Sequence, residues 1–201
     1  MPSFPRPHRV LVIVAATAAA LAASVASPSA GTAFAAACPP PPPSLQPFLG
    51  LGDSSRYVLT TGGAFEAGSP AWALSGGAVV VNDQAPDPLA SAGASRALLL
   101  RAGSSATSAC VTAPQIVGLV RFFAKSVGAA DGRLRVEVLV KGRVYQAGMI
   151  SAGTSWGPTD RLPSGAPAYK GAVTYQVRLT PVGAGAAFAV DDVYFDPYRS
   201  R

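Results

Sequence analysis

Apolar and polar residues alternate along three stretches in the second half of the chain. Within residues 133–141, the apolar side chains share one parity and most of the charged side chains take the other. Residues 118–125 and 173–180 show the same two-residue period. Alternation of this kind is typical of a strand with one buried and one solvated face. We therefore expect this half of the chain to form a sheet.

Shorter apolar runs lie before these stretches, and one follows them. They begin near Tyr57, Ala78, Ala97 and Cys110, and the last covers 188–195. Gly, Pro, Ser and Asp separate the runs, and no helical period of useful length is visible. Many short strands joined by turn residues predict an all-β domain. A folded part of about 150 residues suits a jelly-roll β-sandwich of two antiparallel sheets, with an up-and-down barrel as the alternative.

The first 37 residues have the order of a secretory signal peptide. Arg6 and Arg9 precede an apolar stretch over 10–26, and small residues with an A-x-A pattern follow it. We expect removal of 1–37, or cleavage two residues earlier, with export and no membrane association afterwards. A retained anchor and lipid attachment at Cys38 are the alternatives, but the apolar stretch is short for a span of roughly 20 residues.

Composition narrows the chemistry of the exported chain. Of the 201 residues, 49% are hydrophobic and 13% charged, which argues against a disordered polar chain. Loss of the leader removes His8, the only histidine, and lowers Lys plus Arg from 16 by two to 14, against 10 acidic residues. A chain without histidine has no Ser-His-Asp triad, no Cys-His pair and no His-ligated zinc. The basic residues form no run, so no nucleic-acid partner is expected.

The expected mature chain begins with a cysteine and a run of prolines. We assign 38–47 as a Pro-rich lead-in, stiffened by the prolines at 39–43, and 48–198 as the β-sandwich domain. Cys38 and Cys110 are the two cysteines. An even count in an exported chain predicts a Cys38–Cys110 disulfide, with two buried free thiols as the alternative.

The acidic and serine residues do not form a catalytic pattern. Glu66 and Glu137 are the only glutamates, and the exported chain has no histidine that could activate a serine. We therefore expect a non-catalytic domain. A small hydrolase that uses two carboxylates is the alternative.

Two segments carry a family resemblance. They are G-G-A-F-E-A-G-S-P-A-W, at 62–72, and F-A-V-D-D-V-Y, at 188–194. Together they resemble the galactose-binding-like jelly rolls found in many carbohydrate-binding modules, although Gly63 and Ala64 stand where an Asn-Gly pair is usual. The chain also resembles small secreted proteins of high-GC actinobacteria, in which one cysteine lies near the mature N-terminus and a second near mid-domain.

This resemblance implies a structural calcium ion. In such modules the Glu of the F-E pair and an Asp of the final strand hold calcium, which here points to Glu66 with Asp191 or Asp192. Calcium prefers carboxylate and carbonyl oxygens. Adjacent strand residues face opposite sides, and Asp191 shares the parity of Val193, which favours Asp191. Surface carboxylates paired with arginines are the alternative.

The resemblance also implies a glycan or cell-surface polymer as partner. Trp156 lies in a predicted loop, where it either stacks on a sugar ring or plugs the end of the sandwich. Phe123 and Arg121 have the polar parity of their strand and are candidates for a binding surface, unless a second layer covers them. The alternative function is an extracellular structural or protein-interaction domain without glycan binding.

Overall fold

The computed structural model describes residues 38–83, 85, 95–113 and 118–198. The predicted signal peptide, 1–37, lies outside the described residues. Within the described part, no helix is long and apolar enough to cross a membrane.

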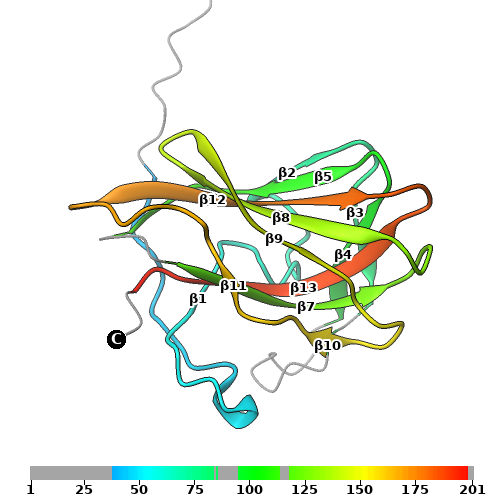
Figure 1. Ribbon diagram of the computed structural model, residues 1–201, viewed down its shortest axis with the longest axis horizontal. Coiled ribbons are helices and arrows are strands. Elements are labelled where there is room, and N and C mark those ends of the chain that lie inside the picture. Colours follow the sequence, from blue (N-terminus) through cyan, green and yellow to red (C-terminus); the bar gives the residue numbers. More distant parts are fainter. Residues whose placement is uncertain (1–37, 84, 86–94, 114–117, 199–201) are drawn as a thin grey trace, which may run out of the picture. The chain divides into compact units, whose positions relative to one another are not determined.

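The domain is a jelly-roll sandwich of two antiparallel sheets, and Figure 1 shows the two layers. The strands of the seven-stranded sheet are β1 (Val58–Leu59), β3 (Val79–Asn82), β4 (Arg96–Arg101), β7 (Leu119–Ser126), β10 (Gly157–Pro158), β11 (Leu162–Pro163) and β13 (Ala187–Asp196). Those of the six-stranded sheet are β2 (Trp72–Ser75), β5 (Ser105–Ser108), β6 (Val111–Ala113), β8 (Arg133–Val140), β9 (Arg143–Ile150) and β12 (Val173–Val182). The predicted fold class is confirmed.

Strand order shows how the chain passes between the layers. The seven-stranded sheet runs β10-β7-β13-β4-β3, with β1 on β13 and β11 on β7. The six-stranded sheet runs β2-β5-β12-β8-β9, with β6 on β12. Neighbours such as β7 and β13 are far apart in the sequence. The sandwich therefore depends on long-range pairing.

The alternating residues of the strands fill the space between the sheets. In β8 and β12, Val138 opposes Val177, and Val136 opposes Leu179. All four are fully buried. The period-two pattern read from 133–141 and 173–180 thus marks the core side of this sheet.

A second layer covers the outer face of the seven-stranded sheet. The N-terminal segment, 38–57, forms a bridge between Leu45 and Tyr57 and a short 3-10 helix, η1 (Leu49–Leu51). Figure 1 shows the blue segment starting beside the six-stranded sheet and passing to the far side of the seven-stranded one, where its short helix lies. Phe48 is fully buried there. The segment therefore forms a second, smaller core outside the sandwich.

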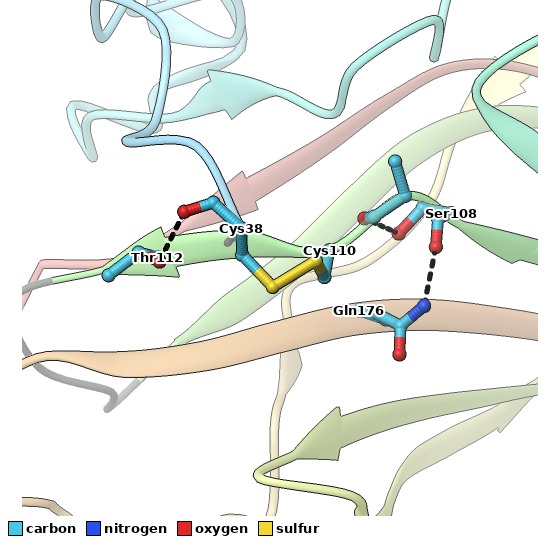
Figure 2. Close-up of a disulfide and its surroundings, with 6 residues drawn as sticks. Cys38, Ser108, Cys110, Thr112 and Gln176 are labelled. Atoms are coloured by element: carbon cyan, nitrogen blue, oxygen red, sulfur yellow. Dashed lines mark hydrogen bonds between the residues drawn. A yellow bond between two sulfur atoms is a disulfide. The ribbon is translucent and has the colours of Figure 1, made fainter. Parts of the chain in front are cut away.

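The predicted disulfide between Cys38 and Cys110 is confirmed, with an S–S distance of 2.04 Å and a Cα–Cα distance of 5.3 Å. Figure 2 shows the bond beside Thr112, whose hydroxyl donates to the Cys38 carbonyl at 2.7 Å. The Thr112 amide also donates to the carbonyl of Pro39. The disulfide and these hydrogen bonds fix the start of the N-terminal segment to the six-stranded sheet.

A bulge interrupts the final strand. The register of β13 against β7 shifts between Asp191 and Tyr194, and Asp192 has a φ of +48°. Asp191 opposes Phe123 on the outer side, whereas Val193 packs in the main core. The shared parity predicted for Asp191 and Val193 is therefore wrong, because the extra residue of a bulge reverses the alternation.

Candidate functional site

The structure buries two of the three predicted sugar-binding residues. Phe123 is 3% exposed and packs against Phe48, with ring centroids 5.8 Å apart. It lies in the second core with Tyr194. Of the two interpretations of Phe123, the structure agrees with the second layer, because the N-terminal segment covers this face.

Arg121 belongs to the same covered face. Its Nη1 donates to Asp53 Oδ2 at 2.7 Å, and its Nε donates to the Thr159 carbonyl at 2.9 Å. Its guanidinium carbon lies 4.2 Å from the centroid of the Phe48 ring. Asp53 also accepts from the Tyr57 hydroxyl at 2.7 Å. Arg121 is 9% exposed and forms a buried ion pair that holds the N-terminal segment, while its predicted ligand-binding role stays a prediction.

Trp156 is partly buried at the edge of the second core. Its Nε1 donates to Asp83 Oδ1 at 3.1 Å, and the Lys125 ammonium lies 5.0 Å from the ring centroid. Lys125 also pairs with Asp83 at 2.8 Å. These contacts hold the indole in place. They agree better with a Trp156 that packs against the protein than with one that is free to stack on a sugar ring. A pocket of about 130 Å³ lies alongside, lined by the neighbouring loop and by Thr159.

The proposed calcium ligands bind main-chain amides instead. Glu66 Oε1 accepts from the amides of Ser95 and Arg96 at 2.9 and 3.0 Å. Asp191 accepts from the amide of Ala85 at 3.2 Å.

Asp191 also accepts from the amide of Asp192 at 2.8 Å, and both aspartates are buried in the bulge. In the described ranges, no group of three or more His, Cys, Asp or Glu residues is arranged to hold a metal ion. Glu66 and Asp191 are therefore hydrogen-bonded to main-chain amides, and calcium binding stays a prediction.

The outer face of the six-stranded sheet presents a polar row that crosses four strands. Thr107 of β5 opposes Arg178 of β12, Arg178 opposes Glu137 of β8, and Glu137 opposes Gln146 of β9. Arg178 Nε donates to Glu137 Oε2 at 2.8 Å, and this hydrogen bond raises the pKa of Arg178. The row lies on the opposite side of the sheet from the core valines. It therefore forms one continuous strip of hydrogen-bonding groups.

Arg135 extends the strip along β8. Its Nε lies 3.6 Å from Glu137 Oε1, which is an ion-pair distance but not a hydrogen bond. The side chains of Arg135 and Arg178 are 40% and 31% exposed, whereas that of Glu137 is only 10% exposed. Two partly solvated guanidinium groups thus share one enclosed carboxylate. We call Arg135, Glu137, Gln146 and Arg178 the polar strip.

The sequence contained part of the signal for this strip. The solvated parity of 133–141 and 173–180 includes Arg135, Glu137 and Arg178. Their lateral alignment, however, depends on the pairing of β8 with β12, which alternation does not specify. Gln146 was missed because its strand, β9, was not recognised.

No protein-family model matches this chain, and no curated protein matches it. Solved structures with a similar fold include a family 61 carbohydrate-binding module in complex with β-1,4-galactotriose, at 20% identity and a TM-score of 0.44, covering 69% of this chain and 96% of that one. Another is the CBM22-1 xylan-binding domain of Xyn10C from Paenibacillus barcinonensis, at 13% identity and a TM-score of 0.43, covering 64% and 86%. A further family 22 xylan-binding domain has 17% identity and a TM-score of 0.42, covering 74% and 99%. These values describe a general likeness of fold.

Proposed function

We propose that this chain is a secreted, non-catalytic domain that binds carbohydrate on the outer face of its six-stranded sheet. The polar strip is the observation that carries the proposal. Sugar hydroxyls both donate and accept hydrogen bonds, and the strip offers guanidinium donors, a carboxylate acceptor and an amide that does both. Hydrogen bonds that involve a charged partner are the stronger ones. A glycan that crosses the strands would meet all three kinds of group.

Apolar side chains beside the strip support the same function. Val144 and Met149 of β9 are 48% and 42% exposed, and Leu139 of β8 is half-buried next to Val144. The C–H groups of a sugar ring require apolar partners, while its hydroxyls require polar ones. Binding sites combine the two in this way, with a few polar groups set among apolar side chains.

The charges of the strip support binding without hydrolysis. A two-carboxylate glycosidase needs a second acid about 5–10 Å from the first. Among the described strands of this sheet, Glu137 is the only acidic residue. It is paired with the guanidinium groups of Arg135 and Arg178 on either side.

The direct test measures glycan binding by the exported protein. Wild type and an Arg135→Gln/Arg178→Gln variant would be compared by affinity electrophoresis in gels that contain soluble polysaccharides, and by calorimetry. Arg101→Gln is the matched control, because Arg101 is exposed on β4 of the other sheet. We expect the double variant alone to lose binding, and a cooperative thermal melt will show that it remains folded although Glu137 has lost its ion-pair partners. If the polysaccharide gels retarded the double variant as strongly as wild type, the proposal would be contradicted. Export would be tested by sequencing the N-terminus of the protein recovered from the culture medium. We expect it to begin at Cys38 or two residues earlier.

A second candidate function is protein interaction without glycan binding, favoured by three exposed leucines. Leu45, Leu49 and Leu51 are 47%, 55% and 58% exposed on the N-terminal segment. Exposed apolar clusters mark interaction sites on soluble proteins. If this function holds, no glycan binds, and Leu49→Ser/Leu51→Ser abolishes self-association or partner capture.

A further inference from the structure

Charged residues are divided unequally between the two sheets. The described strands of the six-stranded sheet carry four arginines, Arg133, Arg135, Arg143 and Arg178, against one acid, Glu137. The described strands of the other sheet carry four cations, Arg96, Arg101, Arg121 and Lys125, against the three aspartates of β13. The six-stranded sheet therefore has a formal charge of 4 − 1 = +3 and the seven-stranded sheet one of 4 − 3 = +1.

The single carboxylate does not neutralise this face. Arg133, Arg135 and Glu137 alternate along the solvated side of β8, and Arg178 lies beside Glu137 on β12. Glu137 has a hydrogen bond to Arg178 and a looser contact with Arg135. Three cations on the outer parity thus face one anion, which leaves a net positive surface around the polar strip.

The arginines keep donors for a second anion. Within the described residues, the Nη groups of Arg178 and Arg135 donate to no protein acceptor, whereas Arg135 Nε is buried and does not face a ligand. Residues two apart along a strand are separated by roughly 7 Å, so Arg133 and Arg135 repeat the positive charge along β8. A guanidinium group binds a carboxylate or phosphate through two parallel hydrogen bonds.

The aromatic residues of this sheet lie on its other side. Tyr145 opposes Val138, and Tyr175 opposes Val140, so both tyrosines have core parity. Single-stranded nucleic acids are bound by stacking their bases on exposed aromatic rings. The described strands present no such ring beside the polar strip, so the favoured polyanion is one without bases.

We infer that the ligand of the polar strip is an acidic glycan, whose carboxylate or phosphate groups bind Arg135 and Arg178 while its hydroxyls bind Glu137 and Gln146. This inference rests on the proposed function and specifies its substrate class. Arg133 adds electrostatic attraction for the acidic glycan along β8 but forms no specific contact with it.

The experiment compares polysaccharides that differ only in charge. The exported protein would be titrated with polygalacturonate and with the fully methyl-esterified form of the same polymer. Phosphomannan, neutral galactan and single-stranded DNA complete the panel, at 20 mM and 200 mM salt. We expect binding to polygalacturonate to be about tenfold tighter than to its ester and to weaken with salt. Comparable binding of phosphomannan would also support the inference and would show that phosphate can serve as the anion.

Variants link this preference to the strip. Arg178→Gln and Arg135→Gln should each remove most of the tenfold preference, whereas Arg178→Lys keeps the charge and should lose only part of it. Arg101→Gln should change nothing, which separates the strip from overall charge. Melting temperatures confirm that each variant is folded.

The remaining outcomes separate the two claims. Equal binding of polygalacturonate and its ester, abolished by the double variant, would overturn the acidic preference and leave the proposed function standing. Binding of no polysaccharide would overturn both. Equal binding of DNA, or an equal effect of Arg101→Gln, would show a general polyanion surface and would overturn the inference.

Discussion

Two buried aspartates should give the stability of the sandwich opposite responses to pH. Asp196, at the end of β13, is 2% exposed and accepts from the Tyr198 amide at 2.8 Å. Burial and the nearby charge of Asp53 raise the pKa of Asp196 to about 6, although that hydrogen bond and Arg161 act against the rise. Burial would also raise the pKa of Asp53, but hydrogen bonds from Tyr57, the Ser55 amide and side chain, and Arg121 lower it to about 2.

The sign of each contribution follows from proton uptake. A carboxyl group with a raised pKa binds more protons in the folded state, so stability increases as the pH falls from about 6 towards the ordinary value of 3.8. A shift of this size corresponds to about 3 kcal/mol. Above pH 3.8, the ionised Asp53 contributes about 2 kcal/mol to the free energy of unfolding. This contribution is lost as the pH falls towards about 2. These two groups together place maximum stability near pH 4.

Asp196→Asn isolates the first contribution, because asparagine can still accept from the Tyr198 amide. The free energy of unfolding would be measured by urea denaturation between pH 3 and 8 for wild type, Asp196→Asn and the control Asp131→Asn, an exposed position. Between pH 7 and 4, we expect wild type to gain about 3 kcal/mol relative to Asp196→Asn and nothing relative to the control. Parallel curves for wild type and Asp196→Asn would refute the reasoning.

Three further perturbations test the packing, the disulfide and the metal prediction. Gly63→Ala would place a methyl group 2.9 Å from the Val193 carbonyl at the bulge, so we expect a loss of about 2 kcal/mol in thermal melts, and none for Gly50→Ala, where the space is open. Cys110→Ser removes a bond between residues 72 apart and should cost about 4 kcal/mol, and reductant should lower wild type to the level of the variant. The main-chain hydrogen bonds on the proposed calcium ligands predict an unchanged melting temperature in excess chelator, whereas a lowered one would support calcium.

Alternation in the sequence was enough to find the central strands but not the edges. The strands β8 and β12 pair on both sides and bury one face, so their apolar residues recur at every second position. The edge strand β9 is half exposed, and its sequence, R-V-Y-Q-A-G-M-I, lacks a continuous apolar parity. Edge strands bury less side-chain area, so pairing with β8 rather than composition determines β9.

Two features around the predicted site residues, the bulge in β13 and the covered face of β7, could not be predicted, for two separate reasons. At Asp191, the bulge changed the parity that had been used to choose between the aspartates. At Phe123, alternation identified the outer side correctly but did not show that another segment covers it. One signal was available: Phe48 and Asp53 precede the first strand, and they are an aromatic partner for Phe123 and an anionic partner for Arg121 of β7.

The same argument explains why the polar strip could not be read from the chain alone. Each of its members looks like an ordinary solvated residue within its own strand. They become one surface only when β12 lies between β5 and β8 in the observed register. A slip of one residue would turn Arg178 towards the core and Leu179 towards solvent. The buried Val177 and Leu179 prevent that slip, so the hydrophobic core fixes the alignment of the charged groups on the opposite side of the sheet.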